Sequence, residues 1–280
     1  MKIGIGVTLW QYPFNSERVD LLNKIEDLGF DVVELFIEDK SKNNLEIIKE
    51  NIKKTSLECV TCSSFVEGNL ISDDINVVKR GVKYIKDSID LCEYLGSSIL
   101  TGPTYGSVVN TEFLNPAVKN KAKRQAVELL KEIGIYASAK NIKIAVEPLN
   151  RYESNFLNTA HEGIDLIKEV DLPNVGLNLD TFHMHMEEKS IKKAVFDAGE
   201  HLFHLHVPEN DRGTPGTGDV DWDGIAESLR KINFCGALVM ESGTPYVEEI
   251  AKLGAFWRVY DYLPDKMAEE GLKFLRQKFN

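Results

Sequence analysis

The strongest constraint on the fold is a regular alternation between short apolar runs and longer amphipathic runs along the 280 residues. The short runs are apolar on both faces, as in parallel strands that are covered by helices. The longer runs carry apolar residues three and four positions apart, such as Leu21, Leu22, Ile25 and Leu28, which is the helical period. Eight strand–helix pairs are expected, at 2–10 and 16–29, 31–38 and 44–55, 58–65 and 75–96, 97–105 and 117–140, 143–150 and 159–170, 175–182 and 190–199, 202–209 and 222–232, and 237–243 and 246–260.

Eight such units in a chain of this length predict an α/β fold, the (β/α)8 TIM barrel. We expect one domain over residues 1–280, with an extra C-terminal helix at 264–279. Glycines follow several helical runs, as at Gly29, Gly96 and Gly199, where they suit helix C-caps. A doubly wound sheet is the alternative, but its first turn would carry G-x-G-x-x-G, and the run that begins at Gly4 does not continue in that way.

Composition and charge narrow the function classes. The chain is 43% hydrophobic and 28% charged, as in a soluble globular protein, and it has no run of 18 apolar residues that could cross a membrane. Its net charge is −11 with Lys and Arg spread along the helices, which argues against a nucleic-acid partner. The N-terminus is expected to be the first strand rather than a signal peptide. A cytoplasmic protein that handles small polar molecules or metal ions fits these features.

A C-x-x-C pair, Cys59 and Cys62, lies inside an expected strand. A thioredoxin-like pair would lie at a helix N-terminus, and residues three apart on a strand face opposite sides. We therefore expect reduced, buried thiols.

Polar residues stand at the ends of four successive expected strands, where a barrel of this kind carries its active site. These residues are Glu147, Asp180, His206 and Glu241. A single Glu at such a position is more often a cap or a salt-bridge partner, and a lone His is usually structural. Three inward carboxylates without a cation would repel one another, so four adjacent strand ends favour a divalent metal. Three oxygens and one imidazole nitrogen suit Mn²⁺, Mg²⁺ or Co²⁺.

Two segments near these ends also draw attention. His183 stands three residues after Asp180, and we expect it on the loop that leaves the strand. Arg212 stands six residues after His206, before the glycine-rich run GTPGTGD. That run is either a plain turn cluster or a loop that orders Arg212 over the site. It lacks the Walker pattern of a phosphate loop.

With these residues the chain resembles the xylose-isomerase-like barrels, and within them the ketose 3-epimerases of the D-tagatose and D-allulose group. The resemblance covers most of the chain and is sharpest from Glu147 onward. The matching segments are EPLNRYESNFLNTA from 147, LDTFHMH from 179, HLHVPENDRGTPGTGDVDW from 204 and VMES from 239. Two segments depart from the pattern. Glu241-Ser242-Gly243 lacks the aromatic residue common in the family, and the run TGPTYGSVVN from 101 lacks a Trp.

The resemblance implies roles for these positions. Glu147, Asp180, His206 and Glu241 match the metal ligands of the family, and Glu147 and Glu241 match its acid/base pair. Glu153, His183 and Arg212 match residues that hold the substrate oxygens near the carbonyl. The implied cofactor is one divalent metal, Mn²⁺ first, with Co²⁺ or Mg²⁺ as substitutes. The implied partners are a sugar substrate and further copies of the chain, in a homodimer or homotetramer.

Such a set is expected to epimerise a ketose at C3 through an enediolate, with the two glutamates on opposite faces of the sugar. Other reactions remain open: an aldose–ketose isomerase, or an enzyme acting on inosose or hydroxypyruvate, would use the same chemistry at another carbon. A metal-dependent endonuclease would need a basic groove and more His than the six present. A non-catalytic sugar-binding protein would have no need for both glutamates.

Overall fold

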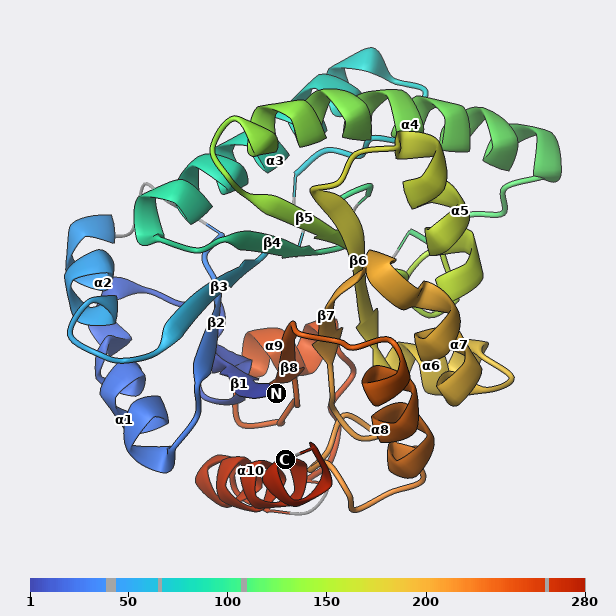
Figure 1. The fold of residues 1–280 in the computed structure, drawn as a ribbon. Coiled ribbons are helices and arrows are strands. Elements are labelled where there is room, and N and C mark those ends of the chain that lie inside the picture. The colour runs from blue at the N-terminus through green and yellow to red at the C-terminus, as the bar shows by residue number, and fades with distance from the viewer. Residues whose placement is uncertain (39–43, 65–66, 107–109, 260–261, 280) are drawn as a thin grey trace.

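Eight parallel strands close into a barrel in sequence order, β1 to β8, in the computed structural model (Figure 1). The structure describes residues 1–38, 44–64, 67–106, 110–259 and 262–279. Pairing of β1 with β8 completes the closure. The strands are β1 (Lys2–Gly6), β2 (Val32–Phe36), β3 (Glu58–Cys62), β4 (Ile99–Gly102), β5 (Lys143–Val146), β6 (Val175–Asp180), β7 (Leu202–His206) and β8 (Ala237–Met240). The predicted TIM barrel is therefore confirmed.

Helices form a ring outside the strands, with α9 seen inside that ring (Figure 1). They are α1 (Asp20–Leu28), α2 (Leu45–Ile52), α3 (Ile75–Leu95), α4 (Pro116–Ser138), α5 (Ala160–Val170), α6 (Thr181–Glu187), α7 (Ile191–Ala198), α8 (Trp222–Lys231), α9 (Glu248–Leu253) and α10 (Pro264–Phe279). The extra C-terminal helix is α10, which packs against β1 and α8. Gly29 and Gly96 end α1 and α3 with φ values of 95° and 83°, in the left-handed region that glycine adopts without strain.

Two predicted boundaries differ from the structure. The segment after β6 is not a loop: Asp180 caps α6 by accepting hydrogen bonds from the backbone N–H groups of Phe182 and His183, which starts a helix at once. The helix expected at 246–260 is the short α9, followed by Gly254 and by Ala255 at a φ of 56°. The ends of two expected elements, Phe65 and Tyr260, lie outside the described residues.

Alternation along each strand separates two apolar layers. Outward residues such as Val33 and Leu35 pack under the helices, whereas Val32, Val60, Ile99, Ala145, Ala237 and Val239 pack inside the barrel. Since side chains repeat every two residues, the next inward positions are Glu34, Cys62, Thr101, Glu147 and Glu241. The apolar interior layer therefore gives way to polar side chains toward the C-terminal ends of the strands.

Two further predictions concern the cysteines and membrane-spanning segments. Cys59 and Cys62 are buried and free, as expected, whereas Cys235 is exposed. Among the described residues, no helix is both long and apolar enough to cross a membrane.

Candidate functional site

The four predicted strand-end residues point to one place inside the barrel. Asp180 and His206 end β6 and β7, and Glu147 and Glu241 directly follow β5 and β8. The structure brings one ligand atom from each to within 4.8 Å of the others. His206 Nδ1 lies 3.2 Å from Glu147 Oε1, 3.3 Å from Glu241 Oε2 and 3.8 Å from Asp180 Oδ2. We call these four residues the strand-end cluster.

Burial and mutual repulsion govern the charges of the strand-end cluster. Burial raises the pKa of Asp180 to about 8, and the carboxylates of Glu241 and Glu147 add to the rise. The pKa of Glu147 is raised for the same reasons, burial first. Glu241 is the exception: burial opposes its charge, but Arg212 and His206 outweigh burial and hold its pKa well below its usual range.

The donor set fits a divalent cation. Asp180 Oδ2 is buried and accepts no hydrogen bond from the described residues. Three carboxylates and one imidazole converge on the same point, which oxygen-preferring divalent metals can neutralise. A buried acceptor without a donor is costly, so its presence beside three other ligand atoms indicates a place for a cation.

Arg212 lies at the rim of the strand-end cluster. Its Nη1 donates to Glu241 Oε2 at 2.6 Å and lies 3.6 Å from Asp180 Oδ2. The guanidinium carbon lies 4.5 Å from the centre of the Phe182 ring, within cation–π range. The backbone of Arg212 has a φ of 63°, an uncommon value for a residue with a side chain. Arg212 therefore lies at the site, where one of the two sequence-based alternatives expected it.

A carboxylate that sequence reasoning missed holds this loop. Glu209 is fully buried. Its Oε1 accepts from the backbone N–H of Val220 at 3.0 Å, and its Oε2 accepts from the backbone N–H of Gly216 at 2.7 Å and from Trp222 Nε1 at 3.1 Å. The glycine-rich run is therefore folded around a buried acceptor.

His183 and Glu153 lie beside Arg212, and Asn150 donates a hydrogen bond to each of these two residues. His183 Nε2 lies 2.9 Å from Arg212 Nη2, and His183 Nδ1 accepts from the backbone N–H of Asn150 at 3.1 Å. The side-chain amide of Asn150 donates to Glu153 Oε1 at 2.7 Å. Burial and the nearby Arg212 lower the pKa of His183 well below its usual value. Burial raises the pKa of Glu153, although Arg212 and Asn150 oppose the rise.

An open cavity lies over these residues. Five of the seven predicted site residues line it, whereas Asp180 and His206 lie beneath. The rest of the lining combines hydroxyl and apolar groups. The full lining is Thr8, Phe36, Cys62, Ser63, Ser64, Pro103, Glu147, Leu149, Glu153, His183, Arg212, Glu241, Ser242, Gly243, Ile250, Leu253, Gly254 and Phe256.

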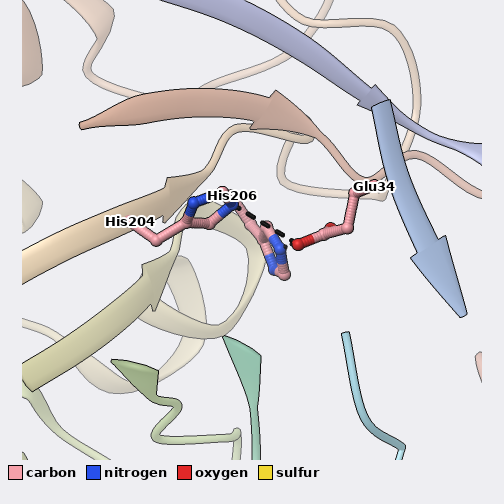
Figure 2. A group of neighbouring side chains, drawn as sticks. All are labelled: Glu34, His204 and His206. Atoms are coloured by element: carbon pink, nitrogen blue, oxygen red, sulfur yellow. Dashed lines mark hydrogen bonds and ion pairs between the residues drawn. The ribbon is translucent and has the colours of Figure 1, made fainter. Parts of the chain in front are cut away.

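A second group of polar residues, below the strand-end cluster, was also missed. Glu34 on β2 is fully buried, and its Oε2 lies 2.9 Å from His206 Nε2 (Figure 2). Its Oε1 accepts from Thr101 Oγ1 at 2.8 Å and lies 3.5 Å from His204 Nε2. The available signal was a single acid on the inward face of an apolar strand.

Comparisons with known proteins agree with this geometry. Residues 22–278 match the family model described as xylose isomerase-like TIM barrel. The chain is 33% identical to D-psicose 3-epimerase of Enterocloster bolteae, over 97% of this chain and 91% of that protein. It is 31% identical to a probable ketose 3-epimerase of Synechocystis, over 100% and 97% of the two chains.

A solved structure is similar over the whole length. The crystal structure of D-psicose 3-epimerase with D-tagatose from Clostridium cellulolyticum H10 superposes with a TM-score of 0.89 at 28% identity, covering 100% of both chains. In agreement with these matches, the chain is a closed eight-stranded barrel with a buried cluster of carboxylates and imidazole at the C-terminal ends of its strands. The chain therefore belongs to the xylose isomerase-like TIM barrel family, in its ketose 3-epimerase group of carbohydrate epimerases.

Proposed function

We propose that the protein is a metal-dependent epimerase that inverts C3 of a 2-ketose through an enediolate. The observation that carries the proposal is the pair Glu147 and Glu241. They come from β5 and β8, both line the cavity, and each has an oxygen within 3.3 Å of the same atom, His206 Nδ1. Two carboxylates that approach one point from different strands can flank a substrate there.

Glu147, Asp180, His206 and Glu241 would hold the cation, for which we expect Mn²⁺, with Co²⁺ or Mg²⁺ as substitutes. When bound, a divalent ion supplies Lewis-acid stabilisation of negative charge that develops on the substrate oxygens. The donor set supports this assignment because Asp180 Oδ2 is buried without a hydrogen-bond donor.

The glutamates would move the C3 proton. One carboxylate removes the proton next to the carbonyl, and the other, protonated, returns a proton to the opposite face. Their different environments support such a division: the pKa of Glu147 is raised by burial, whereas Arg212 holds the pKa of Glu241 low. In the reverse reaction the two residues exchange roles.

Arg212, His183 and Glu153 would position the carbonyl end of the sugar. Arg212 is the cation at the cavity wall, and its contacts with Glu241 and His183 leave it in one orientation. Donors fixed before the substrate arrives stabilise developing charge without reorganisation.

The test is exchange in D₂O. Purified protein with Mn²⁺ is incubated with D-fructose, D-psicose and D-tagatose, and the product is read by NMR. The proposal expects deuterium at C3 together with the C3 epimer, and it expects EDTA to abolish both. Glu227→Gln on the exposed face of α8 serves as a matched control for glutamate variants.

Other outcomes would identify the alternatives. Deuterium at C1 with an aldose product would show an aldose–ketose isomerase, and exchange only with inosose or hydroxypyruvate would show one of those enzymes. No exchange with any of these compounds would refute the proposal. Size-exclusion chromatography tests the homodimer or homotetramer that we also propose.

A further inference from the structure

We infer that Glu34 is a positioning residue that fixes the proton of His206 on Nε2 and so presents Nδ1 to the metal. The inference rests on the proposed function, because it takes His206 as a ligand. Figure 2 shows the Glu34 carboxylate, from β2, directed toward the His206 ring. Its Oε2 lies 2.9 Å from His206 Nε2, which is hydrogen-bond distance.

The two ring nitrogens of His206 face opposite environments. Nε2 faces Glu34, and Nδ1 faces the carboxylates of Glu147 and Glu241. A neutral imidazole carries one N–H donor and one acceptor nitrogen. An ionised carboxylate accepts hydrogen bonds only, so the nitrogen beside Glu34 is a donor. Nδ1 also lies 3.2 Å from Glu147 Oε1, so the metal-free ring can carry a proton on each nitrogen. A cation held by the strand-end cluster would require the lone pair of Nδ1, and Glu34 would then keep the remaining proton on Nε2.

Further contacts hold the Glu34 carboxylate in this orientation. Thr101 Oγ1 donates to Oε1 at 2.8 Å, so Oε2 remains for His206. Glu34 and His206 have side chains that are fully buried, so water does not compete for these bonds.

Glu34, His204 and His206 could in principle form a separate metal site, since their ligand atoms also lie within 4.8 Å of one another. The geometry favours the positioning role. His206 would have to bind two ions through one ring, and Glu34 Oε1 is already occupied by a hydroxyl donor at 2.8 Å. A carboxylate that accepts from the far nitrogen of a ligating imidazole is a common partner in metal sites, and its loss typically lowers metal affinity 10- to 100-fold.

The first test uses the unaltered protein. Long-range ¹H–¹⁵N spectra of the Mg²⁺-loaded chain report which ring nitrogen of each histidine carries a proton, and His206 is the ring whose Nδ1 resonance shifts on loading. We expect Nε2–H for His206 and one ion per chain by calorimetry. A proton on Nδ1, two ions per chain, or no metal binding would overturn the inference.

The second test measures the Mn²⁺ dissociation constant of variants. Glu34→Leu removes the acceptor and should weaken binding roughly 10- to 100-fold, whereas Glu34→Gln keeps an acceptor oxygen and should fall between that variant and the unaltered chain. Thr61→Val is the control, because the Thr61 hydroxyl is buried without a partner among the described residues. Variants that lose thermal stability but keep metal affinity would show a structural role only. Failure of C3 exchange with normal metal binding and an Nε2–H tautomer would refute the epimerase proposal instead.

Discussion

Asp180→Asn should make the metal-free protein more stable while it weakens metal binding. Asp180 Oδ1 caps α6 through the N–H groups of Phe182 and His183, at 2.6 and 3.1 Å. Asn caps helices as well as Asp does, so the replacement keeps that function. The replacement removes one carboxyl group from the strand-end cluster, where burial and the carboxylates of Glu241 and Glu147 raise the pKa of Asp180.

The magnitude follows from the pKa shift. Asp180 has an ordinary pKa of 3.8 and a pKa of about 8 in the folded, metal-free chain, with burial as the main cause. Between these values the folded chain binds more protons than the unfolded chain, so stability falls as pH rises. At pH 7, about 3 pH units above the ordinary pKa, ionisable Asp180 lowers the free energy of unfolding of the metal-free chain by at most ~4 kcal/mol. Asn carries no such cost, although it gives up the attraction of Arg212 at 3.6 Å.

Urea unfolding of both proteins in EDTA, at several pH values, measures this difference. We expect the variant to be more stable near pH 7 and the difference to vanish below about pH 4. Mn²⁺ at 100 times its dissociation constant should stabilise the unaltered chain by about 2.7 kcal/mol and the variant by far less. A variant that is less stable in EDTA, or that gains as much from Mn²⁺, would refute the reasoning.

Two further substitutions probe the walls of the cavity. Gly243→Ala would place a Cβ 2.0 Å from Phe256 Cζ, so we expect a loss of about 1–3 kcal/mol in thermal unfolding and a lower kcat/KM. Phe256→Leu in the same chain should recover the stability, and equal losses in the single and double variants would contradict this. Glu209→Gln turns one acceptor into a donor that faces Val220 N–H, or Gly216 N–H and Trp222 Nε1. We expect about 1–3 kcal/mol of lost stability and faster proteolysis between residues 209 and 220, and unchanged proteolysis would argue against the role of Glu209.

The fold could be predicted because its pattern is local and repeated. Apolar strands with helical runs between them need no long-range information, and parallel strands in a barrel place their C-terminal ends together. For this reason Glu147, Asp180, His206 and Glu241 could be grouped before any coordinate was known. The prediction of a loop at His183 was wrong because Asp180 both ends β6 and caps α6. Strand periodicity does not reveal this double role.

The missed residues depend on contacts that are distant in sequence. Glu34 reaches His206 across 172 positions, and only closure of the barrel brings them together. Glu209 binds a loop that follows it, and that loop could equally have been a plain turn. Phe256 fills the space beside Gly243 from a segment after α9, which no local pattern indicates.

The central claim, that Glu147 and Glu241 serve opposite faces of C3, is tested most directly by one-sided exchange. Glu147→Gln and Glu241→Gln, each at saturating Mn²⁺, are incubated in D₂O with each epimer of a substrate pair. Since one carboxylate remains in each variant, we expect no epimerisation and C3 deuterium in only one epimer, a different one for each variant. Epimerisation by either variant, or exchange confined to the same epimer in both with metal bound, would contradict the account.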